Sequence, residues 1–120
     1  MMFIKKLKDC PEFTAADNSI LREVLNARKG EFRFGYSLAH AVVEPGVTTK
    51  PHRLKTSEVY YIIEGEGLMH IDGEERDVGP GDTVYIPPHA TQYIENNGAV
   101  ELKFLCIVDP AWRPEDEEVI

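Results

Sequence analysis

The sequence predicts an all-β protein, folded as a closed sandwich or a small barrel. Short apolar segments recur at even spacing along most of the chain. Turn-forming pairs separate them, including Pro45-Gly46, Asp72-Gly73 and Asn97-Gly98. The Asp-Gly pair is the strongest of these signals, because a two-residue hairpin turn needs positive φ angles that this pair accepts. Many short strands joined by such turns are typical of closed β architectures.

The first third of the chain is its least regular part. We expect a short edge strand at residues 3–8 and a turn-rich stretch at 10–18. The apolar residues of 19–26 fit one face of a helix as well as a strand. We interpret this segment as a strand, because the surrounding sequence has the turn pattern of an all-β protein. A charged loop at 27–31 then leads into a strand at 32–44.

The rest of the chain alternates strands and turns more clearly. Beyond the central segment, the expected strands are 68–71, 76–78, 83–86, 92–95 and 100–108. Pro87-Pro88 must lie between strands, because proline cannot donate a hydrogen bond inside a paired central strand. We expect one domain of residues 1–120 with its core at about 34–108. Residues 1–33 and the acidic tail 109–120 are then extensions of that core.

The composition is that of an acidic globular chain. The 120 residues are 42% hydrophobic and 28% charged, and the formal net charge is -8. Because the chain is acidic and has no cluster of lysine and arginine, we expect it to be a poor partner for nucleic acid or an anionic membrane. A membrane helix needs about 20 apolar residues, and no apolar run approaches that length. The N-terminal residues do not resemble a secretory signal. With Cys10 and Cys106 as the only cysteines, the expected location is the cytoplasm.

Two polar side chains stand out in the strand-like stretch 46–65, namely His52 and Glu58. In an extended chain, side chains two residues apart share a face. His52 and Leu54 therefore point the same way, as do Glu58 and Tyr60. The even separation between the two pairs keeps this parity, and the polar residues between them allow a bend or bulge. We expect His52 and Glu58 to face one interior.

A second stretch, 81–96, also combines turn residues with short apolar runs. Together the two stretches resemble the paired motifs of the cupin superfamily. Those motifs read G-x5-H-x-H-x3-E-x6-G and G-x5-P-x-G-x2-H-x3-N. The matching positions are Gly46, His52, Glu58 and Gly65 in the first motif and Gly81, Pro87 and Asn96 in the second. Three positions depart from the motifs. Leu54 and Gln92 replace histidines, and His89 replaces a glycine.

The resemblance implies a double-stranded β-helix, or jelly roll, whose motif strands line a pocket at one mouth of the barrel. It also implies that His52, Glu58 and Gln92 hold a divalent transition metal such as Mn, Fe, Ni, Co or Zn. Glutamine is a ligand in some cupin sugar-phosphate isomerases, but Leu54 leaves a weaker site than three histidines and a glutamate. The expected pocket for a small polar metabolite is lined by Leu54, Tyr60 and His89.

Two classes of function are compatible with these residues. In the first, a metal ion polarises a substrate oxygen in an isomerase-like or dioxygenase-like enzyme. In the second, the same pocket binds a small metabolite through hydrogen bonds and holds no metal. A metal-free isomerase, with His52 as general acid or base oriented by Glu58, lies between them. Fold alone does not decide, because one fold of this kind hosts unrelated functions.

Other side chains on the predicted strands have outward parity. His40 and His70 belong to this group, so neither is expected to be a ligand. Val59, Tyr61 and Ile63 also point outward, and similar small cupins pair through their outer strands. We expect these three residues to form the interface of a homodimer.

Overall fold

A computed structural model describes residues 2–30 and 32–120. The strands in these residues are β1 (Glu12–Thr14), β2 (Ile20–Asn26), β3 (Ser37–Val43), β4 (His52–Leu54), β5 (Ser57–Glu64), β6 (Gly67–Ile71), β7 (Glu74–Val78), β8 (Thr83–Ile86), β9 (Gln92–Glu95), β10 (Leu102–Asp109) and β11 (Glu117–Val119). Two short 3-10 helices, η1 (Leu7–Asp9) and η2 (Pro114–Asp116), lie near the two ends.

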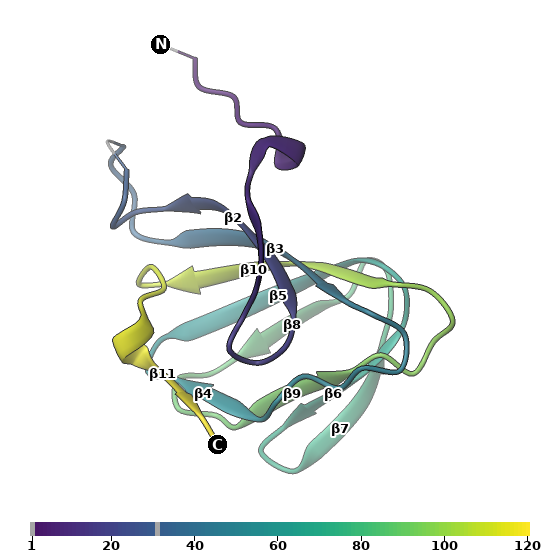
Figure 1. The fold of residues 1–120 in the computed structure, drawn as a ribbon. Helices are drawn as coiled ribbons and strands as arrows, with labels where there is room; N and C mark the ends of the chain where they lie inside the picture. Colours follow the sequence, from purple (N-terminus) through teal and green to yellow (C-terminus); the bar gives the residue numbers. More distant parts are fainter. Residues whose placement is uncertain (1, 31) are drawn as a thin grey trace.

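The strands form two antiparallel sheets that face each other across a buried interior (Figure 1). The larger sheet has the order β1-β2-β3-β10-β5-β8, and the smaller has the order β11-β4-β9-β6-β7. From β3 onward the chain crosses repeatedly between the sheets, so consecutive strands lie in opposite layers, except for the hairpin of β6 and β7 in the smaller sheet. This is the jelly-roll architecture that the sequence predicts, and the all-β prediction is confirmed.

The ambiguous segment before the charged loop is a strand, as we interpreted it. β2 pairs with β1 on one side and with β3 on the other. The helical spacing of its apolar residues reflects a register shift between Glu23 and Leu25, where a bulge interrupts strict alternation. β8 and β9 have the bounds expected from the sequence.

The N-terminal segment differs from expectation. Residues 3–8 are not an edge strand, because the segment ends in η1, and the strand β1 lies instead in the stretch that we expected to be only turns. The guanidinium of Arg22 explains the arrangement. Its Nη1 donates to the carbonyl oxygens of Leu7, Lys8 and Cys10, which holds the chain in a turn just before β1. Such a long-range contact leaves no local signal in the sequence.

The strand expected at 32–44 is shorter than predicted, because β3 begins at Ser37. Before it, the backbone of Gly35 accepts a hydrogen bond from Ala111 rather than joining a ladder. The acidic tail also differs, since it returns to the barrel as β11 and pairs with β4. Its backbone is anchored there, because Lys55 donates to the Asp116 carbonyl and Ile120 donates to that of Pro51.

The core fills the space between the sheets, and the motif glycines fit its close packing. The largest fully buried side chains include Phe104, Ile62 and Ile94. Gly65 has a φ of +84°, and an added Cβ would lie 2.5 Å from the carbonyl oxygen of Glu101. Only glycine fits this position, because other residues disfavour positive φ and carry that Cβ atom.

The asparagine that ends the second motif has a structural role. Asn96 is 1% exposed, and its Nδ2 donates to the carbonyl oxygens of Val43 and Val100. Its side-chain oxygen accepts from the backbone of Gly98, and its carbonyl accepts from the N–H of Gly46. Through its side chain and its backbone carbonyl, Asn96 therefore ties together the loops that carry both motifs, and each polar atom of the side chain has a partner.

The outward parity of the central strand is confirmed. Tyr61 is 45% exposed and Ile63 is 44% exposed, whereas Glu58, Tyr60 and Ile62 on the opposite face are buried. In the described residues, no helix has the length and apolar character needed to cross a membrane.

Candidate functional site

A pocket of about 540 Å³ opens between the two sheets. Its wall combines residues of β2, β3, β4, β5 and β10 with two segments nearer the ends of the chain. The N-terminal part is the turn between β1 and β2, and the C-terminal part runs from Trp112 to Val119. His52, Glu58 and Tyr60 lie on this wall, so the pocket is where the sequence places its site.

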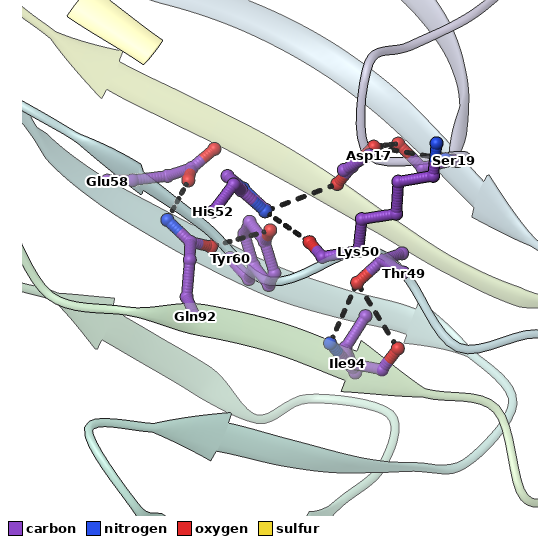
Figure 2. A network of polar contacts seen from close by, with 9 residues as sticks. All are labelled: Asp17, Ser19, Thr49, Lys50, His52, Glu58, Tyr60, Gln92 and Ile94. Atoms are coloured by element: carbon purple, nitrogen blue, oxygen red, sulfur yellow. Dashed lines mark hydrogen bonds and ion pairs between the residues drawn. The ribbon is translucent and has the colours of Figure 1, made fainter. Parts of the chain in front are cut away.

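His52 is 3% exposed and is held by the backbone next to it. Its Nδ1 lies 2.9 Å from the carbonyl oxygen of Lys50 and 3.9 Å from Oδ2 of Asp17 (Figure 2). A carbonyl oxygen only accepts hydrogen bonds, so Nδ1 carries the proton in this contact. In the neutral ring, Nε2 then has a free lone pair.

Glu58, Gln92 and Tyr60 form a hydrogen-bonded chain (Figure 2). The Tyr60 hydroxyl donates to Oε1 of Gln92 at 2.9 Å, and Nε2 of Gln92 donates to Oε1 of Glu58 at 2.9 Å. Strand pairing causes this convergence. Gln92 is directly opposite His52 in the smaller sheet, while Glu58 and Tyr60 project toward it from β5 in the larger sheet.

The environment of Glu58 favours the protonated acid. Its pKa is raised from 4.5 to about 8, chiefly by burial; the bond from Gln92 opposes the shift, and the nearby carboxylates of Asp17 and Glu117 add to it. Burial also raises the pKa of the Tyr60 hydroxyl, so Tyr60 remains a donor at neutral pH. A buried carboxyl that titrates near neutrality is a typical proton donor or acceptor in enzymes.

Two acidic residues of the site were not predicted. Asp17 lies in the turn before β2, where its Oδ1 accepts from the backbone and hydroxyl of Ser19. Glu117 lies in β11, opposite Leu54 of β4, and lines the pocket. Burial raises the pKa of Glu117, and His52 lowers it. The Asp-Asn-Ser turn was a weak signal for Asp17, but nothing in the acidic tail distinguishes Glu117 from its neighbours.

The two other residues expected beside the pocket lie outside its wall. Leu54 is buried and shares the inward face of β4 with His52, as parity predicts, but it does not line the cavity. His89 is exposed in a turn with a φ of 69°, where its N–H donates to the carbonyl of Leu54. Neither residue lines this cavity, so the contact of Leu54 and His89 with a substrate stays a prediction.

The two strand histidines point outward, as predicted. His40 is opposite Leu105 on the outer face of the larger sheet, and burial followed by Lys103 and Arg22 lowers its pKa. His70 stacks on Tyr93 with ring centroids 4.1 Å apart, on the outer face of the smaller sheet. Neither lines the pocket.

The expected metal ligands meet in space but do not form a ready metal site. Both ends of the Gln92 amide are hydrogen-bonded, so an ion at its oxygen would have to share that oxygen with the Tyr60 hydroxyl. His52 and Glu58 then provide two ligands, and Leu54 provides none. In residues 2–30 and 32–120, no group of three or more His, Cys, Asp or Glu side chains is arranged to hold an ion. The residues as placed do not fit a resident metal, and the metal assignment stays a prediction.

Comparison with known proteins identifies the family. The sequence model described as "Cupin domain" matches residues 39–108, which is more than half of the chain. The chain belongs to the cupin family. An uncharacterized protein of Methanocaldococcus jannaschii, MJ1618, is 46% identical over 111 residues, which cover 90% of this cupin and 86% of that protein.

Relatives with described activities are more distant. The oxalate-binding protein of Thermotoga maritima is 31% identical over 71 residues, covering 58% of this chain and 59% of its own. The polyketide cyclase RemF of Streptomyces resistomycificus is 20% identical, with a TM-score of 0.82 over 100% of this chain and 86% of its own. At that identity the likeness shows a shared fold, which this cupin therefore has in common with an enzyme.

Proposed function

We propose that this cupin is a small-molecule enzyme that transfers protons without a metal ion, with Glu58 as the acid and His52 as the base. The observation that carries the proposal is the state of Glu58. It is a buried carboxyl with a pKa of about 8 on the wall of a pocket, so at pH 7 it holds a proton that it can give to a substrate.

The two side chains have complementary roles. Nε2 of His52 has a free lone pair, because Nδ1 donates to Lys50, and it accepts a proton from a carbon next to a carbonyl. Glu58 donates its proton to the carbonyl oxygen, which produces an enol. The reverse transfers at the neighbouring carbon complete an isomerisation. If Glu58 instead protonates a leaving hydroxyl, water departs and a double bond forms.

The orientation of His52 differs from our expectation. We expected Glu58 to orient the ring, but the carbonyl of Lys50 does so, and Glu58 is engaged by Gln92. Two independent supports therefore hold the acid and the base. The Tyr60 hydroxyl holds the Gln92 amide in its orientation. The amide nitrogen then binds Oε1 of Glu58, so Oε2 is the oxygen left free.

Hydrogen–deuterium exchange tests this function. A panel of hydroxyketones, aldoses and β-hydroxy carbonyl compounds would be incubated with the protein in D2O containing EDTA, and deuterium at carbon would be followed by NMR. We expect exchange into at least one compound, with loss of that exchange in Glu58→Gln. If panel members bind but none exchanges, the pocket belongs to a binding protein and not to an enzyme.

A second candidate is the metal-dependent enzyme implied by the motif resemblance. The observation that favours it is that His52, Glu58 and Gln92 converge from β4, β5 and β9. It requires Gln92 to share its oxygen between Tyr60 and the ion, and Glu58 to lose its proton. Exchange that EDTA abolishes and Mn or Co restores would support this candidate over the first.

We also propose that the protein forms a homodimer through the outer face of the larger sheet. Leu105 of β10 is opposite Tyr61 of β5, and Val59 is opposite both Ile107 and Tyr85. These side chains make a continuous apolar surface, with Tyr85 60% exposed. Apolar surfaces of this kind mark interaction sites, and a two-fold pairing would bury the same strands of both copies.

A further inference from the structure

The charges on the pocket wall are strongly unbalanced. Asp17, Glu23, Glu58 and Glu117 contribute four carboxyl groups. In the part of the chain that the structure describes, Lys29 is the only lysine or arginine on this wall, and its Nζ is 2.8 Å from Oε1 of Glu23. The other three carboxyl groups line the pocket with His52 and have no lysine or arginine partner on the wall. They belong to Asp17, Glu58 and Glu117.

These three groups act on one another, so they lie in one part of the cavity. Asp17 and Glu117 both raise the pKa of Glu58, after burial, and Asp17 raises that of Glu117. Like charges held together away from water repel each other, and a positive charge placed among them removes that repulsion. An anion placed there adds to it.

One oxygen of Glu58 has no hydrogen-bond partner from the described residues. Glu58 is 7% exposed, and Gln92 occupies only one of its oxygens. Among the described residues, nothing hydrogen-bonds to the other oxygen, which points away from Gln92 in Figure 2. This oxygen belongs to a side chain on the cavity wall, so a bound molecule can form a hydrogen bond with it. The wall therefore offers a ligand one free hydrogen-bonding position beside the carboxylates of Asp17 and Glu117.

The rest of the wall is apolar. Phe13, Phe104, Trp112 and Val119 line the same cavity. Apolar and aromatic walls bind the carbon skeleton of a ligand, while a few polar groups fix its orientation. Aromatic faces also attract cations. The overall charge of -8 acts in the same direction, because it draws cations toward the protein and repels anions.

We infer that the pocket binds small organic cations, namely a protonated amine attached to an apolar or aromatic body. The ammonium group lies between the carboxylates of Asp17 and Glu117, beside Glu58, which keeps the proton that the proposed function requires. The inference rests on the proposed function in that it names the substrate class of the same pocket. It also separates this cupin from its oxalate-binding relative, whose ligand is an anion.

Three probes of similar shape and different charge test the inference. Benzylamine, benzyl alcohol and benzoate would be titrated calorimetrically into the protein at pH 7, in low salt with EDTA so that no metal mediates binding. We expect benzylamine to bind at least about tenfold more tightly than benzyl alcohol, and benzoate to bind most weakly. Benzoate binding as tightly as benzylamine, equal binding of the amine and the alcohol, or no binding of any probe at millimolar concentration would overturn the inference.

Matched variants locate the cation. Glu117→Gln should weaken benzylamine at least about fivefold and leave benzyl alcohol unchanged, because only a charged ligand loses the attraction. Asp17→Asn should act similarly, since its amide keeps an oxygen for Ser19. Glu118→Gln, an exposed neighbour outside the pocket wall, is the control and should change nothing. If Glu118→Gln weakened benzylamine binding equally, the loss would come from the change in the protein's net charge, and the assigned site would be contradicted.

The outcomes separate the inference from the proposed function. If deuterium exchange depends on Glu58 but benzylamine does not bind preferentially, the acid–base function stands and the cationic substrate class is wrong. If benzylamine binds as expected and no exchange occurs, the pocket is a binding site for amines and the catalytic proposal is wrong.

Discussion

Glu58→Gln should make the protein more stable at neutral pH. The folded protein holds the Glu58 proton up to a pKa of about 8, whereas a free glutamate has a value of 4.5. Between these values the folded state binds more protons than the unfolded state, so stability falls as the pH rises through this window. The contribution of this proton to the free energy of unfolding is complete below about pH 4.5 and is lost by about pH 8.

The size of the effect follows from the shift. At about 1.36 kcal/mol for each pKa unit, wild type should lose about 3 to 4 kcal/mol of unfolding free energy between roughly pH 5 and pH 8 through this group alone. The glutamine side chain has the same shape and does not titrate, and its oxygen still accepts the bond from Gln92. At pH 7 the variant should therefore be more stable by about 3 kcal/mol.

Urea unfolding followed by circular dichroism across this pH range measures both quantities. Glu66→Gln, at an exposed position in the turn between β5 and β6, is the matched control and should keep the pH dependence of wild type. If the free energies of wild type and Glu58→Gln ran parallel from pH 5 to pH 8, Glu58 would not titrate in this window, and its assignment as the acid would be wrong.

Three further predictions test the rest of the site and the assembly. Tyr60→Phe leaves the fully buried Gln92 oxygen unpaired, so the unfolding free energy should fall by about 1 to 3 kcal/mol, and an unchanged urea midpoint would remove Tyr60 from the network. Mn, Co, Ni and Zn salts should not raise the melting temperature of wild type in chelator-free buffer, because, of the expected set, only His52 and Glu58 have a ligand atom without a hydrogen bond. A clear rise that His52→Ala abolishes would restore the metal assignment. In sedimentation velocity the protein should run as a dimer at micromolar concentration and Tyr61→Glu as a monomer, whereas a monomeric wild type would reject the outer-sheet interface.

The sequence by itself determined the architecture and the polar centre of the pocket. Strand parity placed His52 and Glu58 on inward faces, and the structure confirms both. The hairpin turn predicted at Asp72-Gly73 has the positive φ angles that it requires, 48° and 85°. These features depend on neighbouring residues in the chain, so a local pattern is enough to reveal them.

Only the tertiary structure decided what the site residues do. Gln92 was expected to be a metal ligand, but the register that places it opposite His52 also places its amide between Tyr60 and Glu58. The pKa of Glu58 is raised because the side chain is buried near other carboxylates, and no motif carries that information. The spacing of the motif specifies which side chains converge, while their protonation depends on what surrounds them.

The two ends of the chain show the same limit most clearly. Asp17 and Glu117 reach the pocket because the turn before β2 and the strand β11 close over it, although about 100 residues separate them. Their positions depend on backbone pairing between distant segments, such as Glu117 with Leu54. Such pairing is a property of the whole fold, so local sequence patterns indicate only an acidic tail where the folded protein has part of the pocket wall.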